Sequence, residues 1–274
     1  MAHFFELAEI EASEVESHSD VFDQIRRREL QGVLVHNLYP SEILSEVVAR
    51  LERHDPPFVQ TWFPEKFRSC FYGMNLNLTN PEQLPGYFAE TEKFHRQLGE
   101  LFPSPWGVFE YLAPFLSKLD RGKPFVAPPG PRAGQSYMFT TIRAHDQGGF
   151  IPPHCDNEQA YRPSFAQLHT QIRPPMMSFV LALSCPTGGG FLEVYDYQMN
   201  AVSSDSVQPA RSRQAPDFST IPSVKLQLQP GSLIVLDSGR YLHRVSKIEG
   251  TRKRWTLCSF LAENRAGDQV FCWG

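Results

Sequence analysis

The segment "VKLQLQPGSLIVLDS" (residues 224–238) holds two short apolar runs separated by a Pro-Gly pair. Pro and Gly favour a tight turn, and apolar runs of this length favour β-strands. Similar runs recur at "QSYMFTTIRAH" (135–145), "MMSFVLALS" (176–184), "GGGFLEVYD" (188–196) and "RKRWTLCSFLAEN" (252–264). Short strands separated by turns predict a β-sandwich or jelly roll.

Upstream of these strands the sequence has helical character. Apolar side chains recur at helical spacing in residues 39–53, 85–102 and 106–120, and Pro114 is expected to kink the last of these helices. Residues 71–80 could form a strand. A Pro- and Gly-rich stretch at 122–134 follows and marks a change of character. We therefore expect one catalytic domain over 1–274, mainly helical in 1–125, with its β core in 135–262.

Composition limits the class of protein. The chain has 274 residues, 41% of them hydrophobic and 20% charged, which is typical of a globular protein with a sizeable core. The net charge of -4 gives no reason to expect nucleic acid or a membrane surface as partner. Five cysteines without a CxxC motif do not suggest a disulfide framework. The first residues lack the pattern of a secretory signal, so we expect a cytoplasmic protein.

The motif "HCD" (154–156) is a candidate metal site. On an extended segment the side chains of His154 and Asp156 point to the same face, and Cys155 points to the other. His243 follows a buried strand and a turn, and could supply a third ligand from another strand of a jelly roll. Two histidines and one carboxylate form the facial triad that leaves positions open on Fe(II). A zinc hydrolase and a cupin-like protein with a structural metal are the alternatives.

A candidate carboxylate site follows the metal motif. Arg254 and Thr256 are two residues apart on an expected strand and so share a face. A guanidinium binds a carboxylate through two parallel hydrogen bonds, and a nearby hydroxyl can add another. Arg252 lies on the same face and is a competing candidate. The basic run "RKR" (252–254) could instead face water.

Taken together, "HCD", the segment that ends at His243, and "GTRKRWTL" (250–257) resemble the Fe(II)/2-oxoglutarate-dependent dioxygenases. The resemblance implies a double-stranded β-helix core of cupin type with helices packed on it. It implies Fe(II) held by His154, Asp156 and His243, and 2-oxoglutarate held by Arg254, Thr256 or Arg252, with O2 as the oxidant. The sequence is most similar to a branch of stand-alone amino-acid and N-acyl amino-acid hydroxylases and carrier-independent halogenases.

Asp156 distinguishes between the two activities of that branch. Halogenases of this type have a small residue in place of the carboxylate ligand, so the aspartate predicts hydroxylation. Arg143, on the strand before the motif, and Arg162, six residues after Asp156, are candidates for binding an anionic small-molecule substrate such as an amino-acid derivative. A natural-product, nucleotide or protein substrate stays open, as does the oligomeric state. The polar segment 197–220 is expected to be a surface loop.

Overall fold

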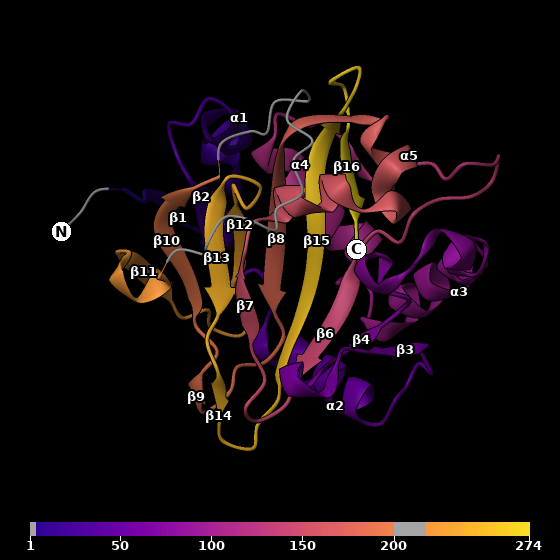
Figure 1. The fold of residues 1–274 in the computed structure, drawn as a ribbon, viewed down its shortest axis with the longest axis horizontal. Helices are drawn as coiled ribbons and strands as arrows, with labels where there is room; N and C mark the ends of the chain where they lie inside the picture. Colours follow the sequence, from indigo (N-terminus) through magenta and orange to yellow (C-terminus); the bar gives the residue numbers. More distant parts are fainter. Residues whose placement is uncertain (1–3, 200–216) are drawn as a thin grey trace.

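The computed structural model describes residues 4–199 and 217–274 (Figure 1). Two β-sheets form its centre. The main sheet has ten strands, which are β1 (Leu7–Glu11), β2 (Gly32–His36), β3 (Gln60–Trp62), β4 (Ser69–Tyr72), β5 (Phe125–Val126), β6 (Thr141–His145), β8 (Ile172–Ala182), β12 (Leu233–Leu236), β15 (Arg254–Asn264) and β16 (Val270–Trp273). The second sheet has four strands, which are β7 (Ile151–His154), β10 (Leu192–Gln198), β11 (Ser223–Leu226) and β13 (Tyr241–Val245).

The order of strands mixes distant parts of the chain. The main sheet runs β1-β2-β12-β8-β15-β6-β4-β3, with β16 and β5 attached to β15, and the second sheet runs β11-β10-β13-β7. The strands β9 (Gly188–Gly189) and β14 (Ile248–Glu249) pair with each other and form a separate two-stranded sheet. Most neighbouring strands are antiparallel, except for the parallel pairs β1 with β2 and β5 with β16. The two sheets enclose a shared interior and form the jelly-roll core expected from the sequence.

The main sheet is buried on both faces, which explains its continuous apolar runs. In β12, Leu233 and Val235 belong to the large core formed with the helices, whereas Ile234 and Leu236 belong to a second apolar cluster that includes Leu192 of the other sheet. The alternation follows from the two-residue period of a strand. One face therefore anchors the helices and the opposite face lines the interior between the sheets.

Helices from the first half of the chain cover the outer face of the main sheet and one of its ends (Figure 1). The described α-helices are α1 (Val21–Arg26), α2 (Ser41–Glu52), α3 (Leu84–Leu101), α4 (Ala113–Leu119) and α5 (Ala166–His169). The structure confirms helices within 39–53, 85–102 and 106–120. Just before Pro114, residues Val108–Leu112 form a π-helical turn, in which the Ala113 N–H donates to the carbonyl of Val108. None of the described helices is both long and apolar enough to cross a membrane.

The N-terminal part also contributes strands, which its expected helical character did not include. β1, β2, β3 and β4 all join the main sheet, and β2 pairs with β12. The main sheet thus extends beyond the expected core boundaries of 135 and 262. Within 71–80, the strand β4 ends at Tyr72 and a 3-10 turn follows at Leu76–Leu78. Most of the expected loop at 197–220 lies outside the described residues, and β10 extends to Gln198.

Candidate metal centre and its cavity

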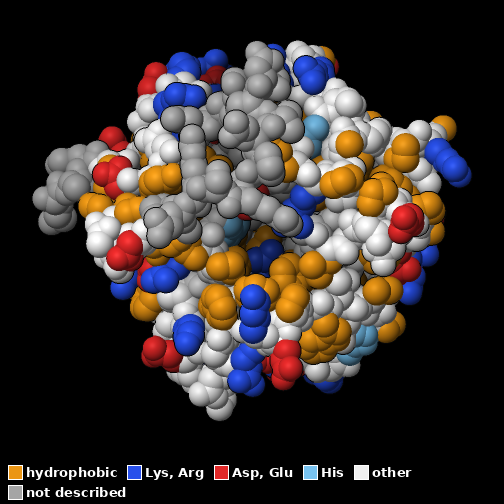
Figure 2. Space-filling view, viewed as in Figure 1, with side chains coloured by type: hydrophobic (Ala, Val, Ile, Leu, Met, Phe, Trp, Pro, Cys, Tyr) orange, Lys and Arg blue, Asp and Glu red, His pale blue; other side chains and the backbone are white. Residues whose placement is uncertain are grey.

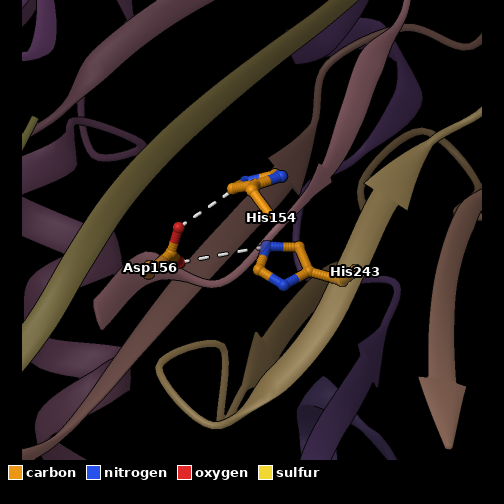
Figure 3. Close-up of side chains that lie close together, drawn as sticks. All are labelled: His154, Asp156 and His243. Carbon is orange, nitrogen blue, oxygen red and sulfur yellow. Dashed lines mark ion pairs between the residues drawn. The ribbon is translucent and has the colours of Figure 1, made fainter. Parts of the chain in front are cut away.

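Three polar side chains meet at the open edge of the second sheet (Figure 3). His154 ends β7, His243 lies on the neighbouring strand β13, and Asp156 begins the 3-10 helix η6 (Asp156–Tyr161) directly after β7. Asp156 places one carboxylate oxygen 3.6 Å from His154 Nε2 and the other 4.0 Å from His243 Nε2. One ligand atom from each residue lies within 4.8 Å of the other two. The structure therefore brings together the three predicted metal ligands.

Backbone carbonyls set the orientation of the two imidazoles. Nδ1 of His154 donates to the carbonyl of Pro152 at 2.8 Å, and Nδ1 of His243 donates to the carbonyl of Tyr241 at 2.9 Å. A carbonyl only accepts, so the proton resides on Nδ1 and the lone pair of Nε2 is left for a metal. The backbone N–H of Asp156 donates to the carbonyl of Ser238 at 3.0 Å and holds this residue beside the strands.

The protonation state also suits metal binding. Burial, and then the charge of His243, lower the pKa of His154 to about 4. The neutral imidazole that binds metal is therefore the stable form near neutral pH. Two nitrogen donors and one carboxylate oxygen fit the facial triad of an Fe(II) oxygenase.

Cys155 lies apart from this site, as predicted. Its side chain is buried in a separate apolar cluster with Tyr195 and Leu242. Burial raises the pKa of its thiol to about 12, so the thiol is neutral near neutral pH. Cys155 therefore packs the sheet and takes no part in the metal centre.

The triad opens into a cavity between the two sheets. Its empty space is about 760 Å³, including the space at its mouth. Figure 2 shows a hollow on this face, with basic and histidine side chains inside it and hydrophobic side chains around it. The wall is mostly apolar, with contributions from Ile151, Phe179, Val180, Leu192, Leu228, Ile234, Leu236, Val245 and Phe260. The polar side chains of the wall are those of Asn75, Thr141, Arg143, His154, Asp156, Ser178, His243, Arg254, Cys258 and Ser259.

Two arginines give this cavity a positive charge. Arg254 begins β15 and is 6% exposed, and Arg143 lies on the adjacent strand β6 with its guanidinium 4.3 Å from the ring centre of Phe71. Among residues 4–199 and 217–274, no carboxylate lies within ion-pair distance of either guanidinium, and Nε of Arg143 is buried without a partner. Burial lowers the pKa of both groups. Asp156 lines the same cavity and favours the charged form of Arg143, but the two guanidinium groups outnumber this one carboxylate and favour binding of anionic ligands.

Two other arginines singled out from the sequence, Arg252 and Arg162, are not among the residues that line the cavity. Arg252 is exposed, precedes the start of β15 and does not line the cavity. Arg162 is also exposed and donates to the backbone carbonyl of Asn77 at 2.8 Å. Its contact ties the segment after Asp156 to the loop after β4, which is a structural role. Thr256 shares the face of Arg254 but is fully buried, and its hydroxyl accepts from the Cys258 thiol at 3.3 Å.

Sequence reasoning missed five polar residues of the cavity, which are Asn75, Thr141, Ser178, Cys258 and Ser259. Cys258 lies on the same face of β15 as Arg254, so strand alternation from Arg254 could have found it. Asn75 lies in the 71–80 segment, and its carbonyl oxygen Oδ1 accepts from the N–H of Asn77 at 2.9 Å. No sequence signal relates Asn75 to the metal motif, because the two meet only through the fold.

The whole described chain matches one protein family. The family model of the carrier-protein-independent halogenase WelO5 matches residues 4–274. This chain belongs to the WelO5 family. The comparison with proteins of curated function gives no match. Membership confirms the predicted superfamily and branch, so the chain is an Fe(II)- and 2-oxoglutarate-dependent enzyme, and His154, Asp156 and His243 form its candidate iron site.

Solved structures share the fold of this WelO5-family chain. An N-substituted L-amino acid dioxygenase from Burkholderia ambifaria AMMD is similar with a TM-score of 0.57 and 13% identity, over 92% of this chain and 91% of that one. The same dioxygenase in complex with α-ketoglutarate gives a TM-score of 0.55 at 13% identity, over 95% and 90% of the two chains. The non-heme α-ketoglutarate-dependent epimerase SnoN from nogalamycin biosynthesis gives 0.51 at 13% identity, over 91% and 85%. These likenesses support the jelly-roll fold.

Proposed function

We propose that this enzyme hydroxylates an unactivated C–H bond of a small anionic molecule, an amino acid or an amino-acid derivative. The observation that carries the proposal is the carboxylate of Asp156 between the two histidines, at 3.6 and 4.0 Å from their Nε2 atoms. The WelO5 family takes its name from a halogenase, and halogenation of this type needs a small residue in place of the carboxylate, so that a halide can bind the metal. Asp156 would fill that position as a protein ligand.

The residues of the cavity have distinct roles in the proposed reaction. Iron bound by the triad would supply the activation of O2, coupled to the decarboxylation of 2-oxoglutarate to succinate. Arg254, with Thr256 beside it, would hold the distal carboxylate of 2-oxoglutarate through charge-assisted hydrogen bonds. Arg143 would hold an acidic group of the substrate and orient its C–H bond toward the metal. The apolar wall would exclude bulk water from the reacting groups.

The anionic character of the substrate rests on the number of cations. With Fe(II) bound, the metal, Arg143 and Arg254 would carry four positive charges, and Asp156 with the 2-oxoglutarate dianion would carry three negative charges, which leaves one positive charge in the cavity. A second anion, supplied by the substrate, would balance it. The N-substituted L-amino acid dioxygenase from Burkholderia ambifaria, which shares the fold, agrees in chemistry with an amino-acid derivative as substrate.

The test supplies purified protein with Fe(II), 2-oxoglutarate, chloride and a panel of amino acids, N-acyl amino acids and nucleotides. Succinate and the mass of the product are measured. We expect succinate together with a product heavier by one oxygen atom for an acidic member of the panel. A chlorinated product would contradict hydroxylation, and turnover of neutral compounds alone would contradict an anionic substrate.

A further inference from the structure

Cys258 differs from the other four cysteines of the chain. Cys70, Cys155 and Cys272 are buried, and Cys185 donates its thiol to the carbonyl of Leu228 at 2.8 Å. Burial raises the pKa of each of these four thiols. Cys258 alone among the cysteines lines the cavity of the metal centre, and it is half-buried there. Its thiol donates to the hydroxyl of Thr256 at 3.3 Å, and its side chain lies at the wall of the cavity.

The surroundings of this thiol are cationic. Cys258, Arg143 and Arg254 line the same cavity, and Cys258 is four residues from Arg254 on one face of β15. Burial is the main influence on the pKa of both arginines and lowers it. The second largest influence is the sulfur of Cys258, which raises the pKa of both. Arg254 is more than nine-tenths buried and has no acidic partner among the described residues. The sulfur therefore lies in a cavity where two positive charges, only partly offset by the one carboxylate of Asp156, attract anions.

We propose that Cys258 is a modification site that takes small carboxylate-bearing electrophiles, held for reaction by the guanidinium groups of Arg143 and Arg254. The sulfur forms a bond to the electrophilic carbon, the leaving group departs with its bonding electron pair, and the thiol proton passes to solvent. The adduct places a carboxylate beside Arg254. This step rests in part on the proposed binding of 2-oxoglutarate at Arg254, because the adduct would then exclude 2-oxoglutarate.

A matched pair of reagents tests the role of charge. Iodoacetate and iodoacetamide carry the same leaving group and differ mainly in charge. The native full-length protein is treated with each reagent without metal, and peptide mass spectrometry gives the labelling rate of each cysteine. The ratio of the two rates is divided by the same ratio for the urea-unfolded chain, which supplies the intrinsic reactivity of each thiol.

We expect Cys258 to prefer iodoacetate by roughly tenfold or more after this correction, in the range by which charged clefts speed association. Added salt should reduce the preference because it screens the attraction. Arg254→Gln and Arg143→Gln should each reduce the preference of Cys258 for iodoacetate. If one variant does not fold, the other variant and the salt series still test whether charge causes this preference. A corrected ratio of one, or faster native labelling of any other cysteine, would overturn the proposal.

Protection by 2-oxoglutarate tests whether the two anions share a site. Saturating 2-oxoglutarate should slow the carboxymethylation of Cys258 and leave the labelling of Cys185 unchanged. Unchanged labelling of Cys258 would overturn the exclusion of 2-oxoglutarate. The labelling needs neither O2 nor substrate, so failure of the hydroxylation assay would not affect its outcome.

Discussion

His154 and His243 are direct register partners across β7 and β13, and the centres of their rings lie 4.3 Å apart. Strand pairing thus sets the separation of the two nitrogen ligands before any metal binds. Asp156 completes the triad from outside the sheet, held by its backbone bond to Ser238. The metal centre is therefore preorganised by backbone hydrogen bonds, and each ligand can be tested against a neighbour that lacks its role.

Removal of the carboxylate ligand should abolish hydroxylation. Asp156→Gly should lower the rate at which hydroxylated product forms, measured without halide, by at least about 100-fold, because loss of outer partners of a metal ligand alone costs 10- to 100-fold. Spectroscopic titration with Fe(II) under anaerobic conditions should show weaker metal binding. Glu158→Gln is the matched control, since it removes an exposed carboxylate from the same 3-10 helix. Unimpaired hydroxylation by Asp156→Gly would refute its role as ligand.

Replacement of Arg254 should weaken the binding of 2-oxoglutarate. A hydrogen-bonded charge pair contributes about 1.5–3 kcal/mol, so Arg254→Gln should raise the KM for 2-oxoglutarate by roughly 10- to 100-fold. Arg252→Gln removes the same charge two residues earlier, outside the cavity, and should leave this KM unchanged. A raised KM for 2-oxoglutarate in Arg252→Gln, with an unchanged KM in Arg254→Gln, would identify Arg252 as the residue that binds 2-oxoglutarate.

Arg143 and Arg162 form a second matched pair. Arg143→Gln should raise the KM for the acidic substrate by roughly tenfold or more and change the KM for 2-oxoglutarate much less. Arg162→Gln should leave both values near those of the wild type, because Arg162 bonds the carbonyl of Asn77 at the surface. Steady-state kinetics with each ligand varied in turn would separate the effects. An equal rise in both KM values for Arg143→Gln would assign it to 2-oxoglutarate as well.

His95 should make the fold sensitive to acid. Burial lowers the pKa of His95 to about 4, and its Nε2 accepts from the N–H of Phe139 at 2.9 Å. The folded state therefore prefers the neutral imidazole, and stability is lost as pH falls below the unfolded pKa of about 6.5 toward 4. This loss amounts to about 2 kcal/mol at pH 5.

His95→Gln keeps a hydrogen-bond acceptor but does not titrate. Urea unfolding of both proteins at pH 7 and pH 5 measures the difference. The wild type should lose about 2 kcal/mol more than the variant between the two pH values. Equal losses would show that protonation of His95 does not contribute.

The metal ligands could be predicted because strand geometry relates them. β7 ends at His154, but Cys155 keeps an extended backbone (φ −120°, ψ 141°), so the period of two still places His154 with Asp156 and away from Cys155. The same period does not place Arg252 beside Arg254, because β15 begins only at Arg254 and Arg252 lies in the preceding turn, outside the cavity wall. Arg162 follows the motif in a 3-10 segment, where spacing does not determine direction.

The strands of the N-terminal part were missed for a different reason. β2 is a five-residue strand, GVLVH, in which the consecutive apolar residues Val33, Leu34 and Val35 are all buried. Such a run has no alternation to mark it as a strand, and length alone does not distinguish it from a buried helix. Its partners, β1 and β12, become apparent only when the chain has folded.

The position of β2 between β1 and β12 also bears on how the enzyme forms. Val33 pairs with Val235, and His154 pairs with His243, so both contacts join segments that leave the ribosome far apart in time. Such a high contact order slows folding, since long loops must close before the pairs form. A nascent chain would expose the apolar edge of β2 until β12 emerges. The enzyme would thus acquire its iron only after nearly all of the chain has been synthesised.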